Sequence, residues 1–421
     1  ANGSVTDSGP ITTTTTLAID AGSANDITLD QSNNVAALQI NSGNNVVFND
    51  TSGLVMCGST ISGNLTLTVR GALSDSGPLT VAGTTAIQQF ANGNDITLND
   101  ANDFGGAVSI STSSSSPINV TLNDTSALVL GTFSIDGDAT ITANGAITGS
   151  EQLAISGNTT LTAGAANDIT LSNSTNSLAG TVSITSADDV TIVNAGNVDL
   201  GASTIAGNLS VTAGGTITDS GALAVAGTTT LAAGAANDIT LDNANNFGGA
   251  VSITSADDVV LNDTGAIALG ASQISGNLAA TANGTITQTG ALNVAGTTAL
   301  AAGAANAITL PELNTFGGAV SIASGRDVTI QANGGFDLGD STVSGNLSVT
   351  AIAGITDSGN IAVTGAAFLS SGCDSMTLGD SSVVSFTGPV TLVSNRDITL
   401  NVSGDLDLVT AGVGGNLAIT G

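Results

Sequence analysis

The sequence predicts an all-β protein, a right-handed parallel β-solenoid of about 18 coils arranged as six repeats of roughly 70 residues with three coils each. Three observations lead to this prediction. A five-residue motif recurs at nearly constant spacing, short alternating runs are separated by turn residues, and large aromatic residues are almost absent. The chain has 421 residues, 55 Gly, nine Phe and neither Trp nor Tyr. A core without wide aromatic side chains must be thin.

The clearest repeated motif is N-D-I-T-L, which is intact in four copies and altered in the last two. The copies lie at 25–29, 94–98, 167–171, 237–241, 306–310 and 374–378. They divide one continuous solenoid, residues 1–421, into approximate repeats at 1–68, 69–140, 141–211, 212–280, 281–350 and 351–421. Because stacked repeats share a core, we expect one domain despite the length of the chain.

Each repeat divides into coils that begin with glycine. In the fourth repeat, coils begin at Gly207, Gly227 and Gly248, and the third is the longest. Apolar and polar residues alternate over four to six positions, which indicates strands. Gly, Asn, Asp and Ser separate the runs, as turns require. Coils stacked at about 4.8 Å would pair their backbones, and parallel crossovers favour right-handed coiling.

One apolar position recurs once in every repeat. It is occupied by Val35, Phe104, Leu178, Phe247, Phe316 and Phe386. We expect these side chains to fill a wider corner of the interior.

Charge excludes several functions. Asp and Glu number 33, whereas the basic residues are Arg70, Arg326 and Arg396, and the chain has no Lys or His. Binding nucleic acid needs clustered cations, and anionic membranes are disfavoured for the same reason. No apolar run is long enough for a membrane-spanning helix, so direct membrane insertion is not expected. β-Helical enzymes that cleave acidic polysaccharides need a positive groove, which three arginines cannot form. We therefore predict no enzymatic activity, no catalytic residues and no required cofactor.

The two cysteines, Cys57 and Cys373, are four repeats apart. In a linear stack this separation exceeds the reach of a disulfide. We therefore expect them to be small, partly buried apolar residues.

An outward acidic column is the candidate metal site. If Ile169 and Val190 face inward, Asp168 and Asp189 face outward on adjacent coils, and Asp238 and Asp258 repeat this arrangement. One interpretation is that these carboxylates accept local backbone N–H groups at strand starts. The other is a calcium ion held by carboxylates and turn carbonyls. The calcium-binding G-G-x-G-x-D nonapeptide of other β-rolls is absent from the sequence.

Threonine-rich segments suggest a further function, ice or crystal binding. The runs Thr12 to Thr16 and Thr228 to Thr230 are the most prominent. A flat array needs Thr at one position on every coil, and we expect the best rows to recur mainly at every third coil.

Two runs, GNLSVTAGGTITDSGALAVAG from Gly207 and TTLAAGAANDITL from Thr229, resemble the repeats of filamentous-haemagglutinin-type secreted adhesins. The resemblance implies a right-handed β-helix, a bacterial exoprotein and an extracellular or cell-surface location, commonly reached by two-partner secretion. The secretion domain of that family, with its Asn-Pro-Asn motif, does not occur in this sequence, which begins ANGSVTDSG in repeat phase. No receptor-binding motif of the family can be placed on a residue here.

The two ends of the sequence complement each other. Joined tail to head, they read GNLAITG-ANGSVTDSGPI, which restores an internal repeat such as GNLAATANGTITQTGAL from Gly276. We therefore expect a secreted structural or filament subunit that stacks head to tail with copies of itself and contacts a host or neighbouring cell surface. Alternatives are a segment of a larger, non-polymerising adhesin with flanking repeats of the same chain, and a calcium-binding or ice-binding solenoid.

Overall fold

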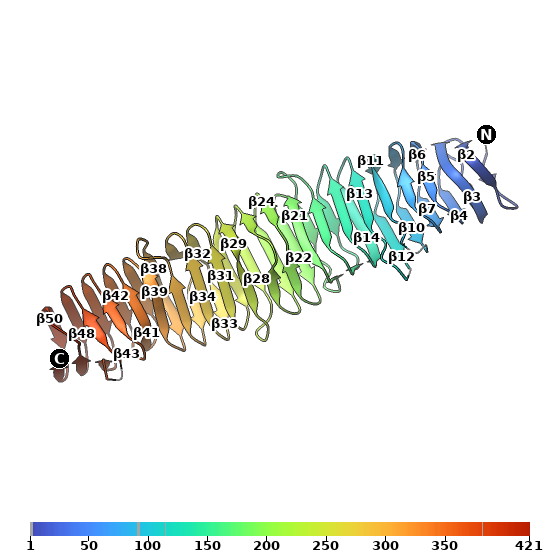
Figure 1. Cartoon of the computed structure of the whole chain (residues 1–421). Helices are drawn as coiled ribbons and strands as arrows, with labels where there is room; N and C mark the ends of the chain where they lie inside the picture. Colours follow the sequence, from blue (N-terminus) through green and yellow to red (C-terminus); the bar gives the residue numbers. More distant parts are fainter. Residues whose placement is uncertain (1–2, 91–92, 114, 381) are drawn as a thin grey trace. The chain divides into compact units, whose positions relative to one another are not determined.

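The computed structural model describes residues 3–90, 93–113, 115–380 and 382–421, and these contain strands and turns but no helix (Figure 1). The chain forms two compact units. The first comprises residues 1–208 with 212–214, and the second comprises residues 209–211 with 215–421. Within each unit the strand pairings are parallel, and each strand pairs with a strand roughly one coil away in the sequence.

The first unit has two long ladders of strands, named here 1A and 1B, with shorter strands at the edges between them. Ladder 1A contains β1 (Val5–Thr6), β3 (Ile27–Ser42), β4 (Val46–Asp50), β7 (Leu65–Val69), β10 (Thr85–Gln89), β12 (Val108–Thr112), β14 (Leu128–Ile135), β16 (Ile147–Gly149), β19 (Ile169–Leu171) and β22 (Val190–Asn194). Ladder 1B contains β2 (Thr12–Asp20), the second half of β3, β5 (Leu54–Met56), β8 (Leu73–Asp75), β11 (Ile96–Phe104), β13 (Val120–Asp124), β15 (Ala139–Ala143), β18 (Thr159–Thr162), β21 (Thr181–Ser186) and β23 (Val198–Leu200). The edge strands are β6 (Ser59–Ile61), β9 (Leu79–Val81), β17 (Leu153–Ile155), β20 (Ser177–Leu178) and β24 (Ser203–Ile205).

The second unit has the same organisation, with ladders 2A and 2B. Ladder 2A contains β28 (Thr229–Ala232), β30 (Ala250–Ser255), β32 (Ile267–Leu269), β35 (Ile286–Gln288), β38 (Ile308–Phe316), β40 (Val328–Ala332), β42 (Leu347–Ala351), β45 (Ala367–Ser371), β48 (Val390–Ser394) and β50 (Leu408–Val413). Ladder 2B contains β26 (Ile217–Asp219), β29 (Ile239–Phe247), β31 (Val259–Asp263), β34 (Leu278–Ala282), β37 (Thr298–Ala301), β39 (Val320–Gly325), β41 (Phe336–Val343), β43 (Ile355–Asp357), β46 (Met376–Leu378), β49 (Ile398–Asn401) and β51 (Leu417–Thr420). The edge strands are β27 (Leu223–Val225), β33 (Ser272–Ile274), β36 (Leu292–Val294), β44 (Ile361–Val363) and β47 (Val384–Phe386), and β25 (Leu209–Ala213) contains residues of both units.

The predicted fold class, a right-handed parallel β-solenoid, is confirmed, and the pairing refines the number of coils. Seven successive strand pairings connect β3, which contains Ile27, to β19, which contains the equivalent residue Ile169 two repeats later. Seven strand pairings likewise connect β29, which contains Ile239, to β46, which contains Met376, in the second unit. Seven turns for two repeats give three and a half turns per repeat. The extra half turn lies in the long third coil of each repeat, which in the fourth repeat contains β30, β31 and β32.

The half turn places equivalent residues of consecutive repeats on opposite ladders. Ile27 and Ile169 lie in ladder 1A, whereas Ile96, from the repeat between them, lies in ladder 1B. In the second unit Ile239 and Met376 lie in ladder 2B, and Ile308 lies in ladder 2A. A surface feature of the repeat therefore returns to the same face after seven turns, about 34 Å at the strand spacing.

The core consists of alternate strand residues that point inward, mostly Val, Ile, Leu and Ala. The predicted apolar column is buried in all six repeats, at Val35, Phe104, Leu178, Phe247, Phe316 and Phe386. These six residues do not form one stack, because the half turn places them alternately at opposite edges of the coil. Phe104 ends β11, for example, whereas Leu178 lies in the edge strand β20.

Four buried threonines interrupt this apolar core at equivalent positions. The side-chain oxygens of Thr85, Thr159, Thr229 and Thr298 are buried and have no hydrogen-bond partner among the described residues. The sixth repeat has Ala367 at the same position, and this residue is also buried. A buried hydroxyl without a partner loses its bonds to water on folding, so these threonines reduce the stability of the core.

We expect Thr159→Val to raise the free energy of unfolding by about 1 kcal/mol, because valine has nearly the same shape and no polar group to desolvate. Thr159 pairs with Ala139 and Val182 on the adjacent coils, so the new methyl group would lie in apolar surroundings. Urea denaturation would measure the change. The outward neighbour Thr160 supplies the control, since Thr160→Val should have little effect. A loss of stability in Thr159→Val would show that the buried hydroxyl is hydrogen-bonded in solution.

Candidate functional site

The predicted acidic column joins adjacent coils through hydrogen bonds to the backbone. Ile169 pairs with Val190, so Asp168 and Asp189 lie on adjacent coils as predicted. Oδ1 of Asp168 accepts a hydrogen bond from the N–H of Asp189 at 3.2 Å. Oδ1 of Asp189 in turn accepts bonds from the backbone and side-chain amides of Asn208, at 2.7 and 2.9 Å. Each carboxylate thus satisfies a donor on the next coil.

The second unit repeats this geometry at the other two predicted residues. Oδ1 of Asp238 accepts the N–H of Asp258 at 3.2 Å, and Oδ1 of Asp258 accepts both amides of Asn277, at 2.7 and 2.9 Å. Asn277 continues the series, because its Oδ1 accepts the N–H of Thr297 at 2.8 Å. Asp and Asn are therefore equivalent here, since both supply an acceptor oxygen at the start of a strand.

This series of outward Asp and Asn side chains, each accepting a backbone N–H from the next coil, is named here the Asx ladder. Further stretches are Asp26–Asn45–Asn64–Thr84, Asp95–Asn119–Asp138–Asn158–Thr181 and Asp327–Asn346–Ala366. The last residue of each series contributes its N–H, and Thr84 also donates its hydroxyl to Oδ1 of Asn64 at 3.0 Å. The mixed Asp and Asn composition of the column follows from this role.

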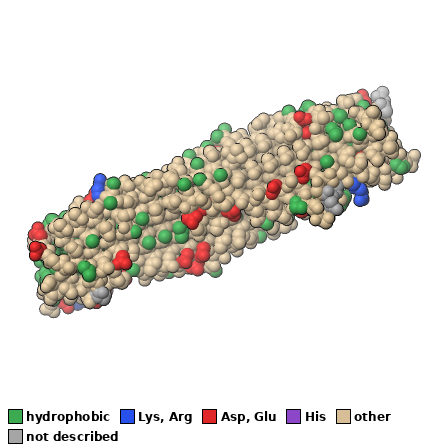
Figure 2. Space-filling view, viewed as in Figure 1, with side chains coloured by type: hydrophobic (Ala, Val, Ile, Leu, Met, Phe, Trp, Pro, Cys, Tyr) green, Lys and Arg blue, Asp and Glu red, His purple; other side chains and the backbone are tan. Residues whose placement is uncertain are grey.

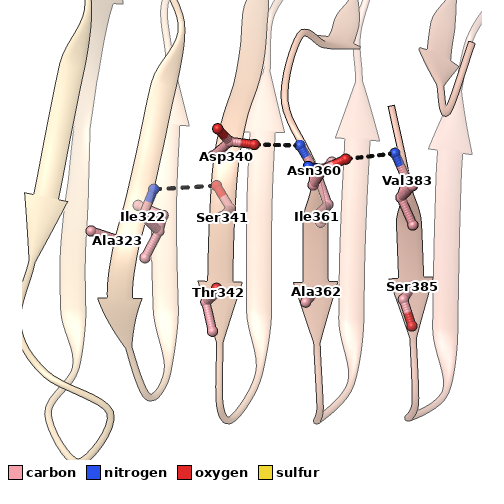
Figure 3. A pocket seen from close by; sticks show the side chains of 10 residues that line it. All are labelled: Ile322, Ala323, Asp340, Ser341, Thr342, Asn360, Ile361, Ala362, Val383 and Ser385. Carbon is pink, nitrogen blue, oxygen red and sulfur yellow. Dashed lines mark hydrogen bonds between the residues drawn. The ribbon is translucent and has the colours of Figure 1, made fainter. Parts of the chain in front are cut away.

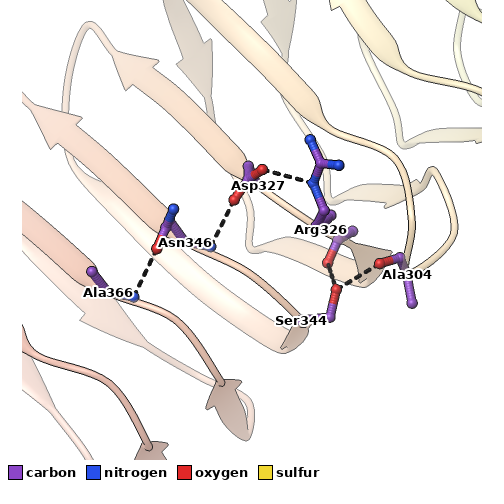
Figure 4. Close-up of polar contacts among 7 residues, drawn as sticks. Ala304, Arg326, Asp327, Ser344, Asn346 and Ala366 are labelled. Atoms are coloured by element: carbon purple, nitrogen blue, oxygen red, sulfur yellow. Dashed lines mark hydrogen bonds and ion pairs between the residues drawn. The ribbon is translucent and has the colours of Figure 1, made fainter.

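One stretch of the ladder also contains an ion pair (Figure 4). Oδ1 of Asp327 accepts the N–H of Asn346 at 3.0 Å, while its Oδ2 accepts Nε of Arg326 at 2.7 Å. These bonds lower the pKa of Asp327, and the N–H of Asn346 has the largest effect. The N–H of Asn45 is likewise the main cause of the lowered pKa of Asp26. These two carboxylates are therefore ionised, and accept hydrogen bonds, at neutral pH.

The acidic column had two interpretations. The observed hydrogen bonds support the one in which its carboxylates accept backbone N–H groups. Among the described residues no group of three or more Asp, Glu, Cys or His side chains is placed to hold a metal ion. Calcium at Asp168, Asp189, Asp238 and Asp258 stays a prediction. The hydrogen bonds of these four residues engage Oδ1 in each case.

We expect Asp189→Asn to keep the stability of the protein within about 0.5 kcal/mol, because asparagine retains the Oδ1 acceptor. Asp189→Ala should lose about 1 kcal/mol, since the N–H of Asn208 loses its partner. Thermal unfolding in calcium and in a chelator would compare the variants. A calcium-dependent rise in Tm that Asp189→Asn abolishes would contradict the backbone role and support a metal site.

The interior contains a second polar network, which the sequence analysis missed. Asn102 and Asp124 are completely buried. Oδ1 of Asn102 accepts the N–H of Leu79 at 2.8 Å, and its amide donates to Asp75 at 2.7 Å. Oδ2 of Asp124 accepts the N–H of Phe104 at 2.9 Å, and its Oδ1 accepts the N–H of Ser126 at 2.6 Å. Neutral donors thus satisfy a buried carboxylate.

The same network recurs in other repeats. Its members are Asp7, Asn33 and Asp50 in the first repeat and Asp219, Asn245 and Asp263 in the fourth. The sequence signal was an Asn two positions before five of the six residues of the apolar column, as in Asn245 and Phe247; the sixth, Phe386, is preceded by Val384. A polar residue beside a strand end was taken for a turn residue, so its burial was not predicted.

Threonine rows are denser than the sequence analysis expected. Thr97, Thr121, Thr140 and Thr160 occupy one register position on four successive coils of ladder 1B. Thr142 and Thr162 begin a second row two residues along the strands. The expectation that Thr rows recur mainly at every third coil is therefore wrong in this region. Successive strands pair in direct register here, so Thr recurs at the same position from coil to coil.

The surface has shallow grooves at the edges of the coils. One groove of about 480 Å³ crosses β39, β41, β44 and β47, and the side chains that line it are mostly small, such as Ala323, Thr342 and Ser385 (Figure 3). Asp340 accepts the N–H of Asn360 at 2.8 Å, and Asn360 accepts the N–H of Val383 at 2.9 Å. Acceptors in this groove already have backbone partners, as in the Asx ladder.

The visible surface is mainly uncharged. On the face drawn in Figure 2, acidic side chains form small groups and apolar side chains are scattered among polar and backbone atoms.

Cys57 and Cys373 are both free cysteines; Cys57 is partly buried and Cys373 is exposed. No helix in the described ranges is long and apolar enough to cross a membrane.

Comparison with known proteins identifies a family of repeats. The model of a family described as repeats of unknown function (DUF5649) matches residues 1–41, 43–111, 118–185, 187–254, 256–323 and 325–393. These six matches agree in number with the six predicted repeats. Neither the curated proteins nor the solved structures contain a match to the chain.

Proposed function

The chain belongs to this family of repeats of unknown function, and we propose that it is an extracellular structural subunit whose coils stack head to tail on copies of itself. The proposed function lies in a regular, extended surface and in contacts between coils, and it requires no catalytic site or cofactor. The observation that supports it is the regular stacking within each unit, in which each strand pairs in parallel with a strand of the next coil.

Covering an inward row with a neighbouring coil has a measurable effect, as the coil that contains β51 shows. Leu417 and Ile419 in β51 are 44% and 37% exposed, whereas Ile398 and Leu400, their partners in β49, are 1% and 0% exposed. These residues belong to the inward row of the strand. Covering them with a further coil of the same kind would bury apolar surface and pair the free edge of β51.

Contact with cell surfaces is part of the same proposal. The repeats resemble those of filamentous-haemagglutinin-type adhesins, which supports a secreted or cell-surface role and a host or neighbouring cell as partner. Net charge of -30 would keep a long polymer soluble and discourage lateral association. Outward strand positions offer regularly repeated polar side chains, such as the threonines of ladder 1B.

We expect the purified chain to form filaments that lengthen with protein concentration, because burial of Leu417 and Ile419 favours association. Ile419→Asp should leave single particles, since it would place a charge in the new core. Ala418→Asp, on the outward face of the same strand, is the matched control and should polymerise normally. Negative-stain electron microscopy and sedimentation would measure the result. Single particles for the unaltered chain and both variants would reject stacking and favour a non-polymerising adhesin segment.

The threonine rows of ladder 1B favour a second candidate function, binding to ice or another regular crystal face. Four coils repeat Thr at one position with the regular strand spacing, as an ordered lattice of hydroxyl and methyl groups would require.

This second candidate predicts inhibition of ice recrystallisation that Thr140→Tyr abolishes, because a bulky side chain would lift the row from a flat surface. Ser134→Tyr, at an outward position in β14, is the control and should retain the effect. Equal behaviour of the two variants, or no inhibition by the unaltered chain, would exclude this candidate.

A further inference from the structure

We propose that a cavity lined by residues of the fifth and sixth repeats binds a small organic cation, with an ammonium group beside a compact apolar part. The cavity is an open hollow of about 520 Å³ at the surface, lined by Phe316, Phe336, Asp337, Gly335, Gly354 and Asp374, among others. It lies in the second unit, where the turns before β41, β43 and β46 follow one another on successive coils. Its size is in the range of small-molecule sites.

The fifth repeat departs from the others where this cavity forms. The residue at the position of Phe336 is Leu54, Leu128, Val198 or Ile267 in the first four repeats. Phe336 packs edge to face against Phe316, with ring centroids 5.9 Å apart. A feature that supports only the stack should recur in every repeat. The aromatic pair is specific to this one, as a binding site would be.

Gly335 keeps part of the cavity open. Ala127 and Ala266 occupy the equivalent position in the second and fourth repeats. A Cβ added to Gly335 would meet its nearest atom, the carbonyl oxygen of Gly354, at 3.8 Å. The backbone therefore accepts a side chain at this position without a clash. Because Gly335 has no side chain, that space remains part of the cavity.

Asp337 has lost the partner that its counterpart retains. In the third repeat, Oδ2 of Asp199 accepts the hydroxyl of Thr181 at 2.8 Å. Val320 pairs with Leu338, which places Ala319 beside Asp337 as Thr181 lies beside Asp199. Alanine has no hydroxyl to donate, and Oδ1 of Asp337 is buried with no hydrogen-bond partner among the described residues. A carboxylate in this state favours a donor supplied from outside.

The charge of the lining selects the class of ligand. Asp337 and Asp374 are acidic, and no Lys or Arg lines the cavity. An anionic ligand would be repelled, whereas an ammonium group can donate to the carboxylates, and an apolar ring or chain can pack against the exposed edge of Phe316, which Phe336 supports from below. This combination points to an aliphatic or cyclic amine.

The test is a ligand-observed NMR titration of the full chain with cyclohexylammonium and, as its neutral counterpart, cyclohexanol. At pH 7 an aliphatic amine is protonated. We expect the amine to bind at least tenfold more tightly than the alcohol. Ala319→Thr, which restores the internal partner of Asp337, and Gly335→Ala, which fills the cavity, should each weaken binding of the amine at least tenfold.

Gly334→Ala is the matched control, because a Cβ at Gly334 meets nothing within 4 Å and this residue does not line the cavity. It should bind within twofold of the unaltered chain. Thermal unfolding of Ala319→Thr should show equal or higher stability, which separates loss of binding from loss of fold. Equal affinity for the alcohol, equal binding by all variants, or no binding by the unaltered chain would each overturn the proposal.

Discussion

The stacking of each coil on the next is the constraint on which the rest of this structure depends. A single coil cannot bury its own inward row, and every backbone N–H and C=O in a strand needs a partner on a neighbouring coil. Within the strands, pairing along the ladders provides these hydrogen-bond partners. The Asx ladder satisfies N–H groups where a strand begins, as Asp189 does for Asn208. Side-chain acceptors therefore extend the hydrogen bonding of the sheet past the ends of its strands.

Three and a half turns per repeat relate consecutive repeats by a half rotation. The long strands of the first repeat, such as β7, lie in ladder 1A, whereas those of the next, such as β15, lie in ladder 1B. Both broad faces of a unit thus carry the same kinds of residues in alternation. A partner that recognises one repeat would meet its site on one face only at every second repeat. The spacing between such sites is set by seven turns, not by the length of the repeat in residues.

Sequence periodicity was sufficient for the fold class, the parallel strands and the outward position of Asp168 and Asp189, because alternation and repeat spacing are local signals. The periodicity did not reveal the half turn. Repeated motifs such as N-D-I-T-L fall at the same point of every repeat in the sequence, whichever face of the solenoid they occupy. Burial of Asn102 and Asp124 was also missed. Their partners are backbone N–H groups on other coils, such as that of Leu79, and sequence spacing alone does not identify such pairs.

The buried network explains how a chain of near-identical coils keeps its register. A shift of one residue would turn every inward row outward, but a slip by a whole repeat exchanges nearly equivalent apolar contacts. Asp124 binds the N–H of Phe104 and that of Ser126, and its charge is compatible with burial only while both donors are in place. The fifth repeat has Ala332 at the equivalent position, and the sixth has Val402. Because the network varies between repeats while the apolar rows do not, a misaligned stack would place Ala332 or Val402 where a buried N–H, such as that of Phe104, needs an acceptor. That cost favours a single alignment of the coils.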